Sequence, residues 1–145
     1  MDATAGTPKT RVAACRADFA AQLRAYRDLV AAASKASGMS LARIDAALAA
    51  FEPGYFNNLL VALAARFAPL GRGVAPSPGD ARDELRLLVA AIVANDGVLA
   101  ADAASGYDPA RSVLRIDTGD RVALNADDFE AIASAFLAAI EQAAE

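Results

Sequence analysis

Histidine is missing from this sequence of 145 residues, and cysteine occurs once, at Cys15. Histidine is the most common general base and the most common transition-metal ligand, so its absence removes the usual means of acid–base and metal-assisted catalysis. A zinc site needs several cysteine or histidine ligands, which this composition does not supply. A single cysteine excludes an internal disulfide and fits a reducing compartment. We therefore expect a protein that is not an enzyme and that holds no metal and no cofactor.

Long apolar segments are missing as well. The longest uninterrupted apolar runs cover residues 59–65 and 87–94, whereas a membrane-spanning helix needs about 20 apolar residues. The mean hydropathy of +0.28 comes largely from about forty alanines, which favour helices but bury little area. The first residues carry charges and lack the apolar segment of a secretory signal. These features predict a cytoplasmic protein with no part embedded in a membrane.

Basic residues are too few to favour nucleic-acid binding. The chain has 14 basic and 18 acidic residues, for a formal net charge of −4, and nonspecific binding to nucleic acid depends on basic side chains that neutralise phosphates. The charge is uneven, because residues 1–43 hold seven basic and three acidic side chains while the remainder holds seven and fifteen. This asymmetry predicts that the basic first helix packs against an acidic remainder of the protein. The alternative is that the first helix presents a basic face to an anionic partner.

The segment from residue 8 to residue 36 predicts one long helix, after a frayed start over residues 1–8. Its larger apolar residues recur every three or four positions and form a narrow stripe of the heptad type, Val12, Cys15, Phe19, Leu23, Tyr26 and Val30. A stripe this narrow is typical of a helix that packs along one groove or one partner helix. The stripe therefore predicts a homo-oligomer formed through the first helix.

Two shorter helices are expected next. Ser40 suits the cap of a second helix over residues 40–51, and Glu52-Pro53-Gly54 is expected to end it. One face of this helix carries four apolar residues, Leu41, Ile44, Leu48 and Phe51. A third helix over residues 55–67 is apolar around most of its circumference, which predicts a place in the centre of a bundle.

The last two helices have clear end signals. Ser77 suits the N-cap of the fourth helix with Asp80 as the acidic partner of a capping box, and Gly97 suits the left-handed position after its end. Asn125 caps the last helix, in which Asp128 stands three positions later. A regular apolar stripe follows on that helix: Phe129, Ile132, Ala133, Phe136, Leu137 and Ile140.

Residues 112–125 predict a β-hairpin between the fourth and last helices. Residues 112–117 and 121–125 alternate apolar and polar side chains around a turn at residues 118–120. The expected fold is thus mainly α: a single domain over residues 1–145, built as a bundle of about five helices with one C-terminal β-hairpin.

The tripeptide Asp117-Thr118-Gly119 resembles the catalytic tripeptide of aspartic proteases. That resemblance covers three residues only, and Asp120 follows the glycine where the family has a small residue. Aspartate and glycine are also ordinary turn residues. We therefore interpret this tripeptide as a turn.

Four polar residues are candidates for a binding site. Asn57 and Asn58 lie at the start of the apolar third helix. If their side chains are buried, they are suited to hold a ligand or to fix the register between helices. The alternative is that they cap the helix or face solvent. Arg72 and Arg82 flank a Gly- and Pro-rich loop that precedes a helix N-terminus, a place where anions bind. No P-loop or dinucleotide fingerprint is present there, so a plain connecting loop is the competing interpretation.

From Ile44 to Ile140 the chain resembles a family of small, uncharacterised bacterial helical proteins without an established activity. The residues that carry the resemblance are Ile44-Asp45, Phe51-Glu52-Pro53, Phe56-Asn57-Asn58-Leu59, Asn95-Asp96-Gly97-Val98-Leu99-Ala100-Ala101-Asp102, Pro109-Ala110-Arg111-Ser112-Val113-Leu114, Gly119-Asp120 and Asp128-Phe129. The chain departs from the family over residues 65–79, which are apolar and rich in proline and glycine where the family is polar, basic and aromatic. The resemblance implies a shared helical fold and cytoplasmic residence, and it implies no substrate.

Three hypotheses about function follow. The first is a non-enzymatic cytoplasmic interaction protein that self-associates. The second is a small-molecule binding or sensor domain, with a pocket between the third and fourth helices and the hairpin. The third is an enzyme that works with carboxylates and arginines alone.

Overall fold

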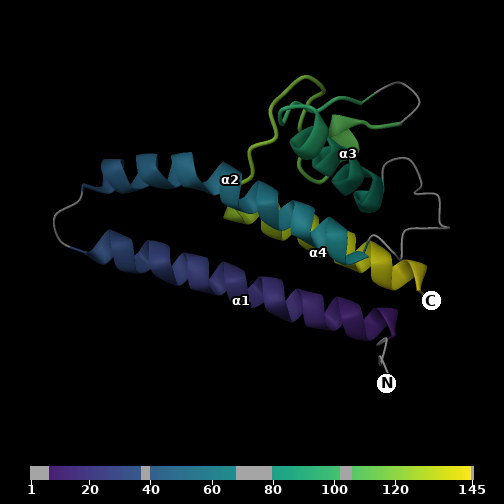
Figure 1. Ribbon diagram of the computed structural model, residues 1–145, viewed down its shortest axis with the longest axis horizontal. Coiled ribbons are helices and arrows are strands. Elements are labelled where there is room, and N and C mark those ends of the chain that lie inside the picture. Colours follow the sequence, from purple (N-terminus) through teal and green to yellow (C-terminus); the bar gives the residue numbers. More distant parts are fainter. Residues whose placement is uncertain (1–6, 37–39, 68–79, 102–105, 145) are drawn as a thin grey trace.

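The computed structural model describes residues 7–36, 40–67, 80–101 and 106–144. In these residues the chain forms four α-helices, α1 (Pro8–Lys35), α2 (Leu41–Phe67), α3 (Ala81–Ala94) and α4 (Ala126–Ala143). A single turn of 3-10 helix, η2 (Pro109–Arg111), lies between α3 and α4. The two long helices α1 and α2 run side by side, α4 lies along both, and α3 packs against α2 and α4 (Figure 1).

Ion pairs between helices define the direction in which each helix runs. Asp18 of α1 pairs with Arg66 at the end of α2, and Tyr26 further along α1 bonds to Glu52 earlier in α2, so these two helices are antiparallel. Arg16 pairs with Glu141, and Arg27 pairs with Asp127, which makes α4 antiparallel to α1 as well. Helix α4 is consequently parallel to α2 and occupies the groove between the two long helices.

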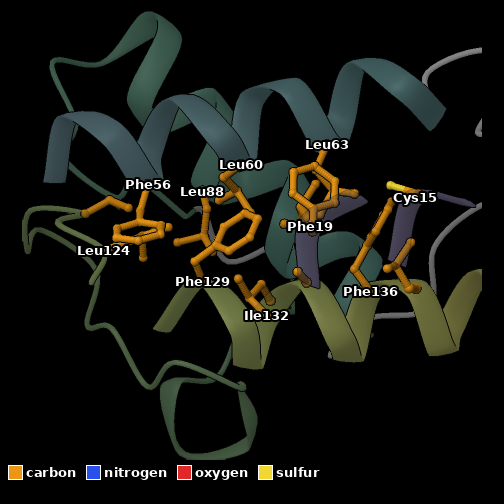
Figure 2. Packing of buried hydrophobic residues seen from close by; sticks show 14 of the residues in the cluster. Cys15, Phe19, Phe56, Leu60, Leu63, Leu88, Leu124, Phe129, Ile132 and Phe136 are labelled. Carbon is orange, nitrogen blue, oxygen red and sulfur yellow. The ribbon is translucent and has the colours of Figure 1, made fainter. Parts of the chain in front are cut away.

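The core lies where α1, α2, α3 and α4 meet. Its largest fully buried side chains come mainly from α2, α3 and α4 and from the segments that follow α3 and precede α4, and include Phe56, Leu60, Leu63, Leu88, Leu99, Leu124, Phe129, Ile132 and Leu137. Figure 2 shows several of these side chains interdigitating, with Phe129 of α4 among Phe56, Leu60 and Leu88. This burial of apolar area is the main source of stability for a helical fold of this kind.

The prediction for the first helix is confirmed, since α1 begins at Pro8 and ends at Lys35. Pro8 suits the first helical position, where a missing N–H costs nothing, and the Thr7 hydroxyl caps the Thr10 N–H. Residues 1–6 of the expected frayed start lie outside the described residues. The heptad-like stripe is buried within this one chain from Val12 to Tyr26, against α2 and α4.

The prediction of about five helices is wrong for the described residues, because the second and third expected helices are one continuous helix. Helix α2 passes through Pro53, which lacks an N–H for the carbonyl of Ala49 and was expected to end the helix. Packing on both sides of the proline outweighs that loss: Phe51 stacks on Tyr55, and Tyr55 and Phe56 both contact Tyr26 of α1. Tertiary contacts therefore override the local signal.

The predicted β-hairpin over residues 112–125 is also wrong. The described residues include no strand, and only an isolated antiparallel bridge joins Val98 to Arg121. The expected turn does form, with Gly119 at φ +94 and the Asp120 N–H donating to the Asp117 carbonyl at 3.1 Å. The backbone after the turn, however, pairs with the segment that follows α3. The Leu99 N–H donates to the backbone carbonyl of Asp120, and the Val122 N–H donates to the backbone carbonyl of Gly97.

The alternating pattern in this segment has a different physical origin from a hairpin. Val122 and Leu124 are buried, whereas Arg121 and Ala123, which alternate with them, are exposed. An extended chain turns alternate side chains toward a core whether or not a partner strand lies beside it. Period-two alternation therefore located the buried residues without revealing which backbone they contact.

The helix caps show one confirmed prediction and one correction. Asn125 and Asp128 form the expected capping box at the start of α4. Asp80, expected inside the fourth helix, is instead the N-cap of α3 and accepts from the Arg82 N–H. The expected N-cap Ser77 lies outside the described residues. At the far end α3 stops at Ala94, and Gly97 has φ +78 as expected.

Candidate interaction surface

Asn57, one of the candidate binding residues, connects α2 to the segment before α4. Its side-chain amide donates to the Val122 carbonyl at 2.9 Å, and its side-chain oxygen accepts from the Leu124 N–H at 3.2 Å. These two bonds satisfy both ends of the amide and position two buried apolar residues. The structure thus uses Asn57 to fix the packing of an irregular segment, as one of the sequence-based alternatives proposed for buried amides.

Of the other three candidates, the two that the structure describes do not join Asn57 in one site. Asn58 is exposed on the next position of α2. Arg82 forms an ion pair with Asp80 at 2.6 Å, half-buried at the start of α3. Burial alone would raise the pKa of Asp80, but the side-chain and backbone hydrogen bonds from Arg82 outweigh it and lower this pKa. Arg72 lies outside the described residues, as does the loop over residues 68–79.

Glu84 is a buried carboxylate that sequence reasoning missed. It is 4% exposed, and its two oxygens accept the N–H groups of Val113 at 2.7 Å and Leu114 at 3.0 Å. A signal exists in the sequence, because Glu84 lies four positions before Leu88 and so shares the buried face of α3. Glu84 binds protein backbone and therefore holds the segment after η2 against α3.

Cys15 is buried on the stripe of α1, near Arg66. Burial raises the pKa of its thiol above the ordinary value, although Arg66 and Arg16 act in the opposite direction. A thiol that stays protonated is a poor nucleophile. Cys15 accordingly acts as a small apolar core residue (Figure 2).

The most distinctive surface is a two-helix projection that we call the arm, defined as residues 28–35 of α1 and 41–52 of α2. Helix α4 begins level with Arg27 and Phe56, as the Arg27–Asp127 pair and the ring contact of Phe56 with Phe129 show. The ends of α1 and α2 that lie beyond this level project past the start of α4 (Figure 1). In the arm each long helix thus loses the neighbour that α4 provides in the body.

Large apolar side chains are exposed on the arm as a consequence. Among the described residues the large hydrophobic side chains that stand exposed are Leu29, Leu41, Phe51, Val93 and Val113. Three of these five belong to the arm, with Leu29 and Leu41 each 66% exposed and Phe51 53% exposed. Leu41 and Phe51 share a helix face with Ile44, which is buried. The chain therefore covers the middle of this face, at Ile44 and Leu48, and leaves Leu41 and Phe51 at its two ends exposed.

An aromatic chain anchors Phe51 to the core. The Phe51 ring stacks on Tyr55 with 5.4 Å between centroids, Tyr55 meets Phe56 at 5.0 Å, and Phe56 meets Phe129 at 5.8 Å. Stacked rings lose few conformations when a partner binds, and such pre-ordered aromatic side chains dominate many protein interfaces. Phe51 is thus a rigid, half-exposed apolar group on the outside of the molecule.

A tyrosine–glutamate hydrogen bond holds the two helices together at the base of the arm. The hydroxyl of Tyr26, on α1, donates to the carboxylate of Glu52, on α2. Burial, followed by the hydrogen bond and charge of Glu52, raises the pKa of Tyr26 well above its ordinary value. The phenol therefore stays protonated and remains a donor to Glu52 throughout the neutral range.

Charge is distributed unequally along the arm. The far end, which we call the tip, carries the basic residues Lys35 and Arg43 and the acidic residue Asp45, all three exposed. The base carries Asp28 and Glu52, and the first turns of α4 beside it add Asp127, Asp128 and Glu130. At the base, the Arg27 side chain pairs with Asp127 at 3.1 Å and with Glu130 at 2.6 Å. The tip thus has one more basic than acidic side chain, whereas the base is acidic.

Two general features of the described chain bear on the site. None of its helices combines the length and apolar character needed to cross a membrane. Within the same residues no three cysteine, aspartate or glutamate side chains gather in a way that would hold a metal ion.

Comparison with known proteins identifies no relative. No protein-family model matches the chain. No curated protein matches it, and no solved structure does. The resemblance to a family of small bacterial proteins therefore stays a prediction, and function has to be argued from the geometry of the arm.

Proposed function

We propose that this protein is a non-enzymatic interaction protein and that the arm is the surface through which it binds another polypeptide. The observation that carries the proposal is the exposure of Leu29, Leu41 and Phe51 on a two-helix projection. Exposed apolar side chains that gather on one projecting element are typical of binding surfaces, whereas scattered ones need no explanation. A helix face with apolar residues at heptad-like spacing is suited to a partner helix.

The chemistry of the remaining polar groups supports a non-enzymatic role. Both carboxylate oxygens of Glu84 accept hydrogen bonds from backbone N–H groups. The side-chain amide of Asn57 donates to one backbone carbonyl and accepts from one backbone N–H. Arg82 is engaged with Asp80. Groups used to hold the fold are poorly placed to act on a substrate as well. The engagement of Asn57 and the exposure of Asn58 leave the small-molecule alternative, which relied on these two amides, without a specific observation in its favour.

The proposal places the protein in the cytoplasm. This placement is supported by the single cysteine, Cys15, which is buried and forms no disulfide. A reducing compartment suits such a thiol.

Site-specific photocrosslinking tests the proposed function. The photoreactive analogue benzoyl-phenylalanine replaces Phe51 in one version of the full chain and Val93 in another, each produced at native level in its own cells. Val93 is the matched control because it is 67% exposed and lies on α3, away from the arm. We expect protein adducts from position 51 and none from position 93. Equal labelling at both positions, or none at either, would contradict the proposal.

A further inference from the structure

Helix α2 carries two helix-breaking residues side by side at the base of the arm, Pro53 and Gly54, which we call the hinge. Pro53 has no N–H to donate to the carbonyl of Ala49, and prolines are the usual places at which helices bend. Gly54 is exposed, and a Cβ built on it would meet nothing within 4 Å, so no close contact requires a glycine there. Glycine inside a helix is destabilising because it loses the most backbone freedom on folding. The hinge is therefore the weakest point of α2.

The two halves of α2 on either side of the hinge differ in how firmly they are held. The body half has four buried apolar residues that belong to the connected core, Phe56, Leu60, Leu63 and Phe67. The arm half, residues 41–52, has Ile44 as its buried residue, and Ile44 does not belong to the connected core of the described residues. Leu48 is only partly buried against that core. Segments with few buried contacts open at a lower free energy than the rest of a protein.

Two contacts hold the arm half in place close to the hinge. The Tyr26 hydroxyl of α1 donates to the carboxylate of Glu52, the last residue of the arm half. The Phe51 ring stacks on Tyr55, which lies beyond the hinge and stacks in turn on Tyr26. Both contacts lie within one turn of the hinge, so few interactions at the base of the arm keep the arm half beside α1.

We infer that α2 bends or opens at the hinge, so that its arm half separates from α1 as one unit while the body stays folded. Opening uncovers Ile44 and Leu48, which lie between the exposed Leu41 and Phe51 on one face of the helix. The apolar face of the arm is then continuous. A partner that binds this face shifts the equilibrium toward the open state. The inference rests on the proposed function in this respect, since it says how the binding surface is regulated.

Thiol labelling of the purified chain measures the opening. Cys15→Ala removes the native thiol, and Ile44→Cys or Leu60→Cys then places one thiol at a buried position in the arm half or the body half of α2. A maleimide reagent reaches such a thiol only when the protein opens there. We expect labelling at position 44 to be about a hundredfold faster than at position 60. Far-UV circular dichroism checks that each variant keeps its helices.

Substitutions at the hinge distinguish this opening from fraying at the start of α2. Pro53→Ala restores the missing N–H, and Gly54→Ala favours the helix at an exposed position with room for the methyl group. Each should slow labelling at position 44 by about tenfold. Asn58→Ala is the matched control, because it also favours the helix but lies in the body half, and it should leave labelling at position 44 unchanged. Fraying would respond to none of the three substitutions.

A substitution in the body distinguishes the opening from global unfolding. Glu84→Gln weakens the attachment of the segment after η2. It should therefore speed labelling at position 60 and leave position 44 unchanged, whereas global unfolding would speed labelling at both.

Three results would overturn the inference: labelling at position 44 that is no faster than at position 60, that ignores both hinge variants, or that becomes faster in Glu84→Gln. The proposed function fails separately, because the labelling uses the purified chain without a partner. An arm that stays closed while position 51 crosslinks to another protein excludes the opening alone. An arm that opens while position 51 gives no adduct excludes the binding alone.

Discussion

Replacing Asn57 with alanine tests whether its side-chain amide fixes the segment before α4. The substitution removes a bond to the Val122 carbonyl and a bond from the Leu124 N–H, at 2.9 and 3.2 Å. Each hydrogen bond of this kind contributes about 0.5–1.5 kcal/mol net, so the loss amounts to about 1–3 kcal/mol. The lower half of this range is expected, because Asn57 is half-buried and water reaches the groups left behind.

Asn58→Ala is the matched control for this experiment. Asn58 is the next residue of the same helix and is exposed. Alanine favours a helix over asparagine by about 0.5 kcal/mol at either position. The difference between the two variants therefore isolates the hydrogen bonds of Asn57.

Urea unfolding followed by circular dichroism measures this difference, together with thermal unfolding. Relative to Asn58→Ala, we expect Asn57→Ala to lower the free energy of unfolding by about 1–2 kcal/mol and the melting temperature by about 3–6 °C. Two variants of equal stability would show that the amide contributes nothing and would refute the reasoning.

Three further predictions concern α1, α2 and α3. Glu84→Gln should lower the free energy of unfolding by about 1–3 kcal/mol, because an amide nitrogen then faces a backbone donor, and amide hydrogen exchange after η2 should become faster. The raised pKa of Tyr26 means that the folded chain holds this proton more tightly than the unfolded chain. Its contribution to stability is complete below the ordinary tyrosine pKa of 10.0 and is lost as the pH rises above it. Tyr26→Phe should therefore flatten the stability profile in alkali, as urea unfolding at several pH values would show. Pro53→Ala should raise the free energy of unfolding by about 1–2 kcal/mol by restoring an N–H to α2, measured in the same way.

Each of these predictions has a contrary outcome. Unchanged amide exchange after η2 in Glu84→Gln would mean that the carboxylate does not hold that segment. An unaltered alkaline profile in Tyr26→Phe would place the titrating group elsewhere. A loss of stability in Pro53→Ala would mean that the proline shapes α2 in a way the contacts of Tyr55 depend on.

The ends of the helices were predictable where the signals are local. Pro8 begins α1, Asn125 caps α4, and the turn at Gly119 forms as its residues suggest. These features depend on a few neighbouring backbone groups, whose hydrogen bonds the adjacent side chains supply. Local signals failed at Pro53 because the competing contacts come from Tyr26, 27 positions earlier in the chain.

The candidate site shows the same division. The spacing of Leu41, Ile44, Leu48 and Phe51 is visible in the sequence, but nothing in that spacing distinguishes a buried face from an exposed one. The stripe of α1 has an equivalent spacing and is buried within the chain, so its prediction as the contact for self-association loses its structural basis. Asn57 and Asn58 are adjacent on α2, but only Asn57 is directed toward the core. Asn58 is exposed to water.

Composition and periodicity determine that this chain is mainly helical and that it lacks the side chains most used for catalysis. These properties depend on residue type and on neighbours within two or three turns. The tertiary structure decides where α4 begins relative to α1 and α2, and this one relation leaves the arm without a third helix. It also decides that Glu84 and Asn57 bind backbone groups 29 and 65 positions away. Contacts of that range arise from how the helices pack together, which no short stretch of the chain encodes.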